Sequence, residues 1–203
     1  MHQFWMVASL VAILSMGQAM AAEQEQKEET AETKAEELEQ NVVDEVLPSP
    51  TEIITKPEAQ AVDPKGEDPL DDAITCLSRT IYWEARGEEA AEMEAVANVV
   101  MNRLGHEDFP DTTCEVVMQG SEQGACQFSW WCDGRSDIAE EDEAYVIAKD
   151  IARKALNGQL IDRTGGALYF HHRETTPDWA AEYIKTVEAG VFVFYKPHEI
   201  LEE

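Results

Sequence analysis

The residues best suited to chemistry lie in one short run, Thr80-Ile81-Tyr82-Trp83-Glu84-Ala85-Arg86-Gly87-Glu88. An apolar, helix-like pattern places the carboxyl group of Glu84 between the indole of Trp83 and the guanidinium of Arg86, and Gly87 then interrupts the pattern. A carboxyl group beside a large apolar ring has a raised pKa, because burial disfavours its charged form. Such a group keeps its proton near neutral pH and can donate it. We therefore predict that Glu84 is a general acid.

The elements that must position this run are mainly helices. Apolar residues recur at helical spacing in three segments, which predict helices over residues 73–85, 89–104 and 140–156. Gly105 follows the second segment as a natural C-cap. Residues 106–135 are irregular. Thr164–His171 has the pattern of a turn that leads into a short extended segment, and Val191–Tyr195 is a second β-prone run. The sequence therefore predicts an α+β domain, mostly helical, with a small β element and long loops that shape a groove.

Four cysteines, Cys76, Cys114, Cys126 and Cys132, form an even set that favours two disulfides, for which three connectivities are open. Cys126 and Cys132 are near enough in sequence to close a small loop, which would leave Cys76 with Cys114. Zinc sites need closely paired cysteines with histidines nearby, and these spacings do not match that pattern. We predict no metal and no cofactor.

Residues 1–21 resemble a secretory signal peptide. An apolar stretch from Phe4 to Met16 precedes Ala19-Met20-Ala21, the small-x-small pattern that signal peptidases cleave. The rival interpretation is an uncleaved membrane anchor, but the stretch is short for a span of roughly 20 residues. Membrane contact is expected only if this segment stays uncleaved. We predict an exported protein of the periplasm or cell envelope.

Residues 22–72 have the composition of a disordered acidic linker. From Glu23 to Asp72 there are 17 acidic residues against four lysines, a net charge of −13, with five prolines and no aromatic residue. Such a segment buries too little apolar surface to offset its ordering entropy. Residues 73–203 then remain as one domain. The chain as a whole has a net charge of −27, and a field of that sign repels nucleic acid.

Five sequence blocks, in order, resemble the SleB-type cell wall hydrolases, the spore cortex-lytic enzymes and their relatives. The blocks are Glu84–Glu88, Ala95–Arg103, Phe109-Pro110, Gln127–Ser129 and Gly165–Phe170. The resemblance covers about residues 76–195. It implies a lysozyme-like fold and cleavage of the bond between N-acetylmuramic acid and N-acetylglucosamine in peptidoglycan. It also implies that Glu84 is the catalytic acid, and that the chain is similar to lytic transglycosylases, which close a 1,6-anhydro ring instead of adding water.

Two positions depart from the family pattern. Glu92 stands where the family usually has glycine, and Phe192 occupies the histidine position of a C-terminal G-x-H-x-F-Y pattern. We expect the first to alter packing at the start of the second helix. The second would change sugar binding or the orientation of the acid, if the family's histidine serves either purpose.

The remaining candidate residues are those expected to bind the substrate. Amide and hydroxyl groups hydrogen-bond to sugars, and aromatic faces stack on sugar rings. These residues are Glu88, Gln127, Ser129, Trp130, Tyr169 and His171. For Glu88 a loop-stabilising role is the competing interpretation, and Trp179 is expected to be a core anchor more than a lip of the groove.

Three functions remain open. The first is glycan cleavage by Glu84, as a lytic transglycosylase or a muramidase. The second is a catalytically weak or inactive peptidoglycan-binding module. The third is an exported interaction protein that works through its acidic tail. The third predicts that loss of residues 23–72 destroys activity while Glu84→Gln does not, and glycan cleavage predicts the reverse.

Overall fold

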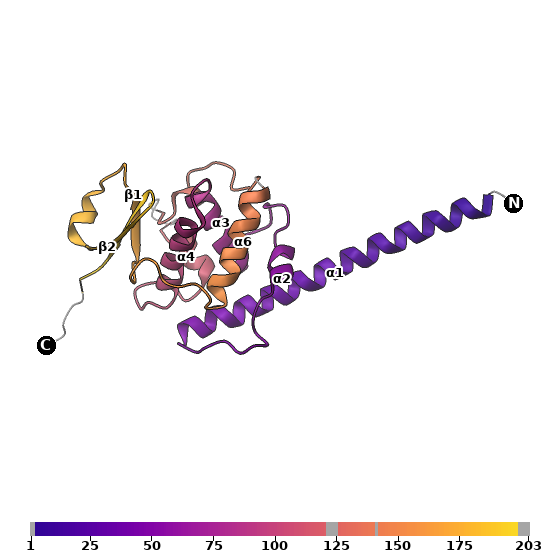
Figure 1. Ribbon diagram of the computed structural model, residues 1–203, viewed down its shortest axis with the longest axis horizontal. Helices are drawn as coiled ribbons and strands as arrows, with labels where there is room; N and C mark the ends of the chain where they lie inside the picture. The colour runs from indigo at the N-terminus through magenta and orange to yellow at the C-terminus, as the bar shows by residue number, and fades with distance from the viewer. Residues whose placement is uncertain (1–2, 121–125, 141, 199–203) are drawn as a thin grey trace.

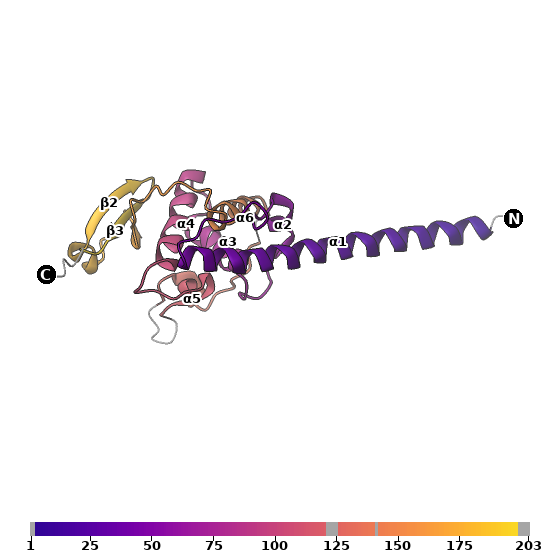
Figure 2. The same ribbon diagram turned by 90° about the horizontal axis from the view of Figure 1, so that it is seen from below.

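The computed structural model describes residues 3–120, 126–140 and 142–198, and it combines a helical body with a small sheet at one end (Figure 1). Helix α3 (Ala73–Ala85) is central, and α4 (Ala90–Leu104) and α6 (Asp142–Leu156) pack against it. The short helix α5 (Thr113–Met118) lies beside α3 and α4 (Figure 2). These bounds confirm the three predicted helices to within two residues.

The local sequence explains where α3 begins and ends. The carboxylate of Asp72 accepts a hydrogen bond from the backbone N–H of Thr75 at 2.9 Å and caps the first turn. Ile74, Leu77 and Ile81 form a fully buried stripe along the helix. After Ala85 the chain leaves helical geometry, and Gly87 adopts φ +91°, a conformation that favours glycine.

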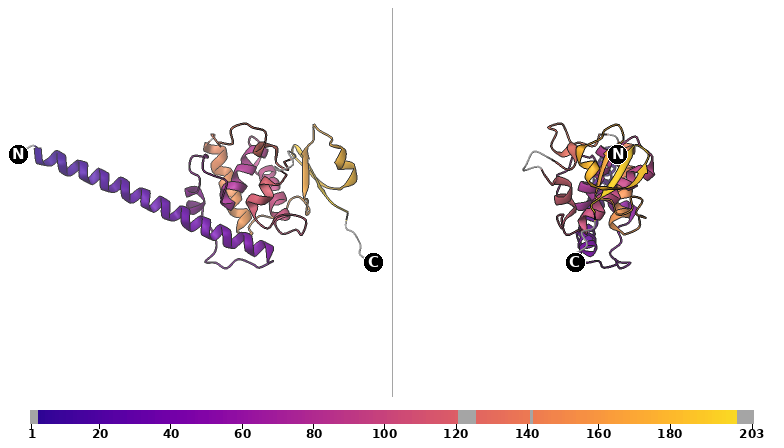
Figure 3. Two further views of the ribbon diagram at one scale, coloured as in Figure 1. Left: turned by 180° about the vertical axis from the view of Figure 1, so that it is seen from behind. Right: turned by 90° about the vertical axis from the view of Figure 1, so that its left-hand side faces the viewer.

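The sheet has three antiparallel strands in the order β1-β3-β2. They are β1 (Tyr169–His172), β2 (Ile184–Ala189) and β3 (Phe192–Lys196). Strands β1 and β3 match the two predicted segments, whereas β2 was not predicted. Two short 3-10 helices, η2 (Ser129–Trp131) and η3 (Asp178–Glu182), lie in the loops. The sheet lies at the far end of the body from the N-terminus (Figure 3).

Both predicted disulfides are present, Cys76–Cys114 and Cys126–Cys132. The first joins α3 to α5, and the second closes the loop that contains Gln127 and Ser129. Disulfides form and persist in oxidising compartments. This chemistry agrees with a location outside the cytosol.

The acidic segment is not a disordered linker, so that prediction was wrong. Helix α1 (Gln3–Val43) runs through it, and α2 (Lys56–Ala61) follows. The first part of α1 extends away from the body, while its last turns lie along it (Figures 1 and 2). Ala31, Ala35 and Leu38 recur at helical spacing and are at most 1 % exposed, because they pack into the same core as α3 and α6. The domain core therefore does not begin at residue 73.

Polar contacts hold the rest of this segment to the body. The side-chain amide of Asn157 donates to the carbonyl of Ile54 and accepts from its N–H, each at 2.9 Å. Lys34 on α1 forms an ion pair with Glu58 on α2 at 2.8 Å. Composition misjudged the segment because a few small apolar residues, correctly spaced, are enough to anchor a highly charged helix. Within the described residues, no helix has the length and apolar character needed to cross a membrane.

Candidate functional site

Glu84 lies in the last turn of α3, where the helix leaves the core. It follows Ile81 by three residues, so its side chain continues the buried stripe and is itself half-buried. Two cavities border it, one of about 710 Å³ and one of about 280 Å³. Ser129 also borders both cavities. We call these two cavities, whose linings share Glu84 and Ser129, the groove.

Burial raises the pKa of Glu84 to about 7, and the positive charge of Arg103 partly opposes this rise. A carboxyl group with this pKa is about half protonated at neutral pH. It can therefore donate a proton and, once ionised, accept one. This is the electrostatic setting that the sequence predicted for a general acid.

Arg103, in the last turn of α4, is the residue whose part in the site the sequence did not predict. It is 2 % exposed and borders the larger cavity. Its Nε donates to the carbonyl of Leu168 at 2.7 Å, and one terminal nitrogen donates to Oε1 of Gln127 at 3.3 Å. The guanidinium also lies over the rings of Phe128 and Tyr169. Burial lowers its pKa to about 10, so it stays charged at neutral pH.

An arginine in the last turn of a helix, two residues before a glycine, gave only a weak signal for this role. Asn102 and Arg103 both hydrogen-bond to the loop that precedes β1. The groove contact was not evident because it depends on the distant residues Gln127 and Tyr169. Nη1 of Arg103 is buried without a hydrogen-bond partner among the described residues.

The structure brings most predicted substrate-binding residues together with Glu84. Gln127, Ser129, Tyr169 and His171 border the larger cavity, and Trp130 borders the smaller one. Glu88 borders neither of the two. The other residues that line the larger cavity are Cys126, Phe170, His172, Thr175, Pro177, Trp179, Tyr183 and Phe192.

Strand β1 and helix η3 make an aromatic wall for the larger cavity. Tyr169 and His171 share one face of β1, as the alternation of a strand predicts. The ring of His171 stacks on Tyr195 at 5.3 Å, and its Nε2 lies 3.1 Å from the Tyr195 hydroxyl. Trp179 packs at 5.7 Å from His171 and 6.0 Å from Tyr169. Trp179 is therefore a lip of the groove, contrary to the expectation of a core anchor.

The smaller cavity has a more polar lining. Trp83 donates its indole N–H to the carbonyl of Asp137 at 3.2 Å. The guanidinium of Arg86 lies 4.5 Å from the centre of the Trp83 ring and donates to the Tyr82 hydroxyl at 3.1 Å. Besides Glu84, the acidic residues that line this cavity are Asp133 and Asp137.

Residues 87–195 match the model of the family described as Cell Wall Hydrolase. The chain belongs to the cell wall hydrolase family. Glu84 lies three residues before the matched region, so the match itself does not include it.

Curated relatives of this cell wall hydrolase are named spore cortex-lytic enzymes. The protein from Halalkalibacterium halodurans is 31% identical over 125 residues, which cover 60% of this chain and 34% of the relative. The one from Bacillus subtilis is 28% identical over 122 residues, which cover 59% of this chain and 36% of the relative. The chain thus spans little more than a third of the length of these relatives.

Two solved structures resemble this chain. The catalytic domain of the Bacillus cereus SleB protein gives a TM-score of 0.50 at 29% identity, covering 61% of this chain and 89% of that one. The catalytic domain of the Bacillus anthracis protein, described as a germination-specific lytic transglycosylase SleB, gives 0.51 at 29%, covering 61% and 93%. The lysozyme-like α+β fold and the resemblance to SleB are therefore confirmed.

The two departures from the family pattern both lie near the β2–β3 turn of this hydrolase. Phe192 is 4 % exposed and packs edge-on against Phe170 at 5.4 Å, so it fills the base of the groove with an apolar ring. Glu92 is buried at the start of α4 and contacts the turn directly. Neither residue contacts Glu84 through a hydrogen bond or ion pair among the described residues.

Proposed function

We propose that this cell wall hydrolase cleaves peptidoglycan glycan strands between N-acetylmuramic acid and N-acetylglucosamine, with Glu84 as general acid and then base. The observation that carries the proposal is the position of Glu84. Its carboxyl group has a pKa raised to about 7 and stands where two cavities of one groove meet. A sugar chain lying along the groove would place one glycosidic bond beside that proton.

The groove walls suit a chain of acetylated sugars. Tyr169, Trp179 and Tyr183 offer aromatic faces for sugar rings, and Gln127 and Ser129 offer polar groups for hydroxyl and N-acetyl groups. Arg103 is buried behind Gln127 and donates a hydrogen bond to the oxygen of its side-chain amide, which fixes the orientation of that amide. This orientation favours the Gln127 N–H groups as donors toward the substrate.

In the proposed reaction, Glu84 gives its proton to the bridging oxygen while the bond from that oxygen to C1 of the muramic acid breaks. Positive charge then develops on the sugar ring. The Glu84 carboxylate next takes the proton from the C6 hydroxyl of the same sugar, and O6 bonds to C1 to close the 1,6-anhydro ring. Because the nucleophile is intramolecular, this route needs no second carboxylate.

Hydrolysis is the competing outcome, and it has a specific candidate for the second group. Asp133 and Asp137 border the smaller cavity, and burial raises the pKa of Asp137. In an inverting glycosidase a second carboxylate activates water from the opposite face of the sugar. We favour ring closure because Glu84 is the carboxylate that borders both cavities, whereas these two aspartates border only one.

The proposed location is the periplasm or cell envelope. Residues 1–21 are proposed as the export signal, and the two disulfides would form after export. Peptidoglycan, which lies outside the cytoplasmic membrane, is then accessible to the enzyme.

The test is to incubate the purified chain with peptidoglycan sacculi and identify released muropeptides by mass spectrometry. We expect anhydro-muramoyl ends from the wild type and from Glu107→Gln, a control at an exposed carboxylate that borders neither cavity, and none from Glu84→Gln. Reducing ends that disappear in Asp137→Asn would instead identify a hydrolase. Binding to sacculi without release by the wild type would overturn the proposal in favour of a binding module.

A further inference from the structure

The segment before α3 contributes a buried carboxylate that is connected to the groove. Asp63 is 0 % exposed and lies in the loop after α2, with φ +41°. Its Oδ2 accepts hydrogen bonds from Nε of Arg79 at 2.8 Å and from the Tyr145 hydroxyl, and its Oδ1 accepts from the N–H of Asp68 at 3.0 Å. Although burial opposes ionisation, these hydrogen bonds hold the pKa of Asp63 below its usual range. Asp63 is therefore a buried anion at neutral pH.

Arg79, on α3, joins Asp63 to the backbone of Asp137. It is 2 % exposed and pairs with Asp63 at 2.7 Å. Its Nη1 donates to the backbone carbonyl of Asp137 at 2.7 Å, and its Nη2 donates to the carbonyl of Asp68 at 3.2 Å. A planar guanidinium held by a carboxylate has a fixed orientation. The Asp137 carbonyl is thus fixed by the same pair.

The Asp137 carbonyl also receives the indole N–H of Trp83, which stands next to Glu84 and supports the Arg86 guanidinium. The residues Trp83, Arg86 and Asp137 all border the smaller cavity. The connection from Asp63 therefore ends on the groove wall, one residue from the proposed acid.

A second contact joins the same two segments. The carbonyl of Gly66 accepts from the N–H of Ala139 at 2.8 Å, and Gly66 has φ +72°. A Cβ at this position would clash with the Ala139 backbone. The loop of residues 63–68 is therefore fitted closely against the 137–139 strip that forms the wall.

We propose that Asp63 is a positioning residue for the substrate groove, holding the Trp83 wall in place through Arg79 and the Asp137 carbonyl. Asp63 lies outside the region that matches the family, which begins at Gly87. The proposal rests on the groove being the glycan site. It also makes the acidic N-terminal segment part of the site. Loss of activity on removal of residues 23–72 is then expected for the enzyme as well, so this deletion no longer distinguishes glycan cleavage from a function of the acidic tail.

The test compares three variants of the full chain. Asp63→Asn removes the anion. Arg79→Lys keeps a buried cation for Asp63 but lacks the forked group that reaches both Asp63 and Asp137, so it remains informative if Asp63→Asn does not fold. Glu58→Gln is the matched control, because it breaks the Lys34–Glu58 ion pair of the same segment, which does not reach the groove.

Two readouts are needed, both made below the unfolding temperature of each variant. The first is the indole N–H signal of Trp83 in a ¹⁵N-labelled NMR spectrum, assigned with Trp83→Phe. The second is the kinetics of release from sacculi. In Asp63→Asn and Arg79→Lys we expect the Trp83 indole N–H signal to shift and its proton to exchange faster with solvent. Because the groove wall then holds the substrate less well, KM should rise about tenfold while kcat changes less than about threefold.

In Glu58→Gln both readouts should equal the wild type. An unchanged Trp83 signal in Asp63→Asn and Arg79→Lys would overturn the proposal, as would an equal loss of activity in the control. The NMR readout does not depend on catalysis. If the wild type releases nothing from sacculi, the proposed function fails, and the Trp83 signal still decides whether Asp63 holds the wall.

Discussion

Glu92 connects the start of α4 to the turn between β2 and β3. Its Oε1 accepts a hydrogen bond from the N–H of Val191 at 2.9 Å, and its Oε2 accepts from the N–H of Glu89 at 3.1 Å. One carboxylate thus caps a helix and anchors the sheet that carries Tyr169 and His171. Glycine, the residue usual here in the family, has no side chain to make either bond. The departure therefore supplies a structural connection between α4 and the β2–β3 turn.

Replacing Glu92 with alanine should destabilise the protein. The variant loses a helix cap and leaves the partly buried N–H of Val191 without its acceptor, a cost of about 1–3 kcal/mol in the free energy of unfolding. Urea denaturation measures this value. Glu94→Ala on the same helix is the control, because its ion pair with Arg163 is half exposed and is worth about 0–1 kcal/mol. Equal losses in the two variants would contradict the connection.

The sequence predicted the parts of the fold that depend on local pattern. Helices α3, α4 and α6 followed from apolar spacing and caps, and Glu84 followed from the stripe that ends at Ile81. Strand β2 was missed because its half-exposed residues gain their stability from pairing with β3. The place of Arg103 in the groove was not predicted, since its groove neighbours come from distant segments. Helix α1 was missed because the prediction relied on the net charge of the segment, and three apolar residues at helical spacing, Ala31, Ala35 and Leu38, are enough to anchor it.

The pKa of Glu84 predicts how activity depends on pH. The acid must be protonated in the free enzyme, so kcat/KM should fall as pH rises through about 7. Arg103 lowers this pKa by its charge. Arg103→Met should therefore move the falling limb to higher pH, while Arg103→Lys should leave it nearly in place. Initial rates on sacculi between pH 5 and 9 provide the profile. A limb that stays fixed in Arg103→Met would show that the two residues are not coupled.

The same pKa predicts a cost in stability. Glu84 has a folded-state pKa near 7, above the value of about 4.5 for the unfolded chain, so its contribution to stability is complete below pH 4.5 and is lost as pH rises to 7. At pH 8, Glu84→Gln should stabilise the protein by about 1–3 kcal/mol, and at pH 4.5 the two should be nearly equal. Thermal unfolding at the two pH values measures the difference. If Glu84→Gln were less stable than the wild type at pH 8, the conclusion that burial raises the pKa of Glu84 would be contradicted.

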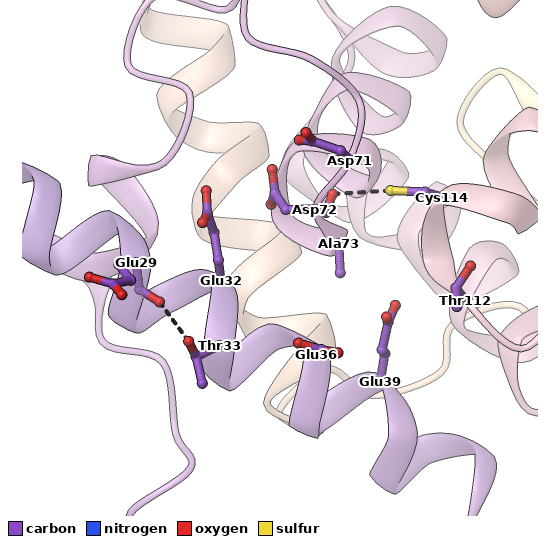
Figure 4. Close-up of a pocket in the computed structure, with 10 residues that line it drawn as sticks. All are labelled: Glu29, Glu32, Thr33, Glu36, Glu39, Asp71, Asp72, Ala73, Thr112 and Cys114. Atoms are coloured by element: carbon purple, nitrogen blue, oxygen red, sulfur yellow. Dashed lines mark hydrogen bonds between the residues drawn. The ribbon is translucent and has the colours of Figure 1, made fainter.

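Acidic side chains gather where α1 meets the body. A cavity of about 550 Å³ separates the two, and Figure 4 shows Glu32 and Glu39 projecting from α1 toward the Asp72 and Thr112 side. The carboxylates that line it are Glu29, Glu32, Glu36, Glu39, Asp71 and Asp72. Burial, followed by the charges of Asp72 and Glu28, raises the pKa of Glu32 to about 7. Lys34 on α1 and Arg79 on α3 pair with Glu58 and Asp63 instead of with these carboxylates.

Docking of α1 should therefore weaken as pH rises. A raised carboxyl pKa means that the docked state binds more protons, so its stability is greatest below about pH 4.5 and decreases up to about pH 7. Hydrogen exchange in residues 28–43 should be slower at pH 5.5 than at pH 8, after correction for the intrinsic effect of pH, and the difference should shrink in high salt. Glu32→Gln should remove much of the pH dependence, whereas Glu37→Gln, at an exposed position of the same helix, should not. Equal protection at both pH values would show that the apolar contacts of Ala31, Ala35 and Leu38 alone determine docking.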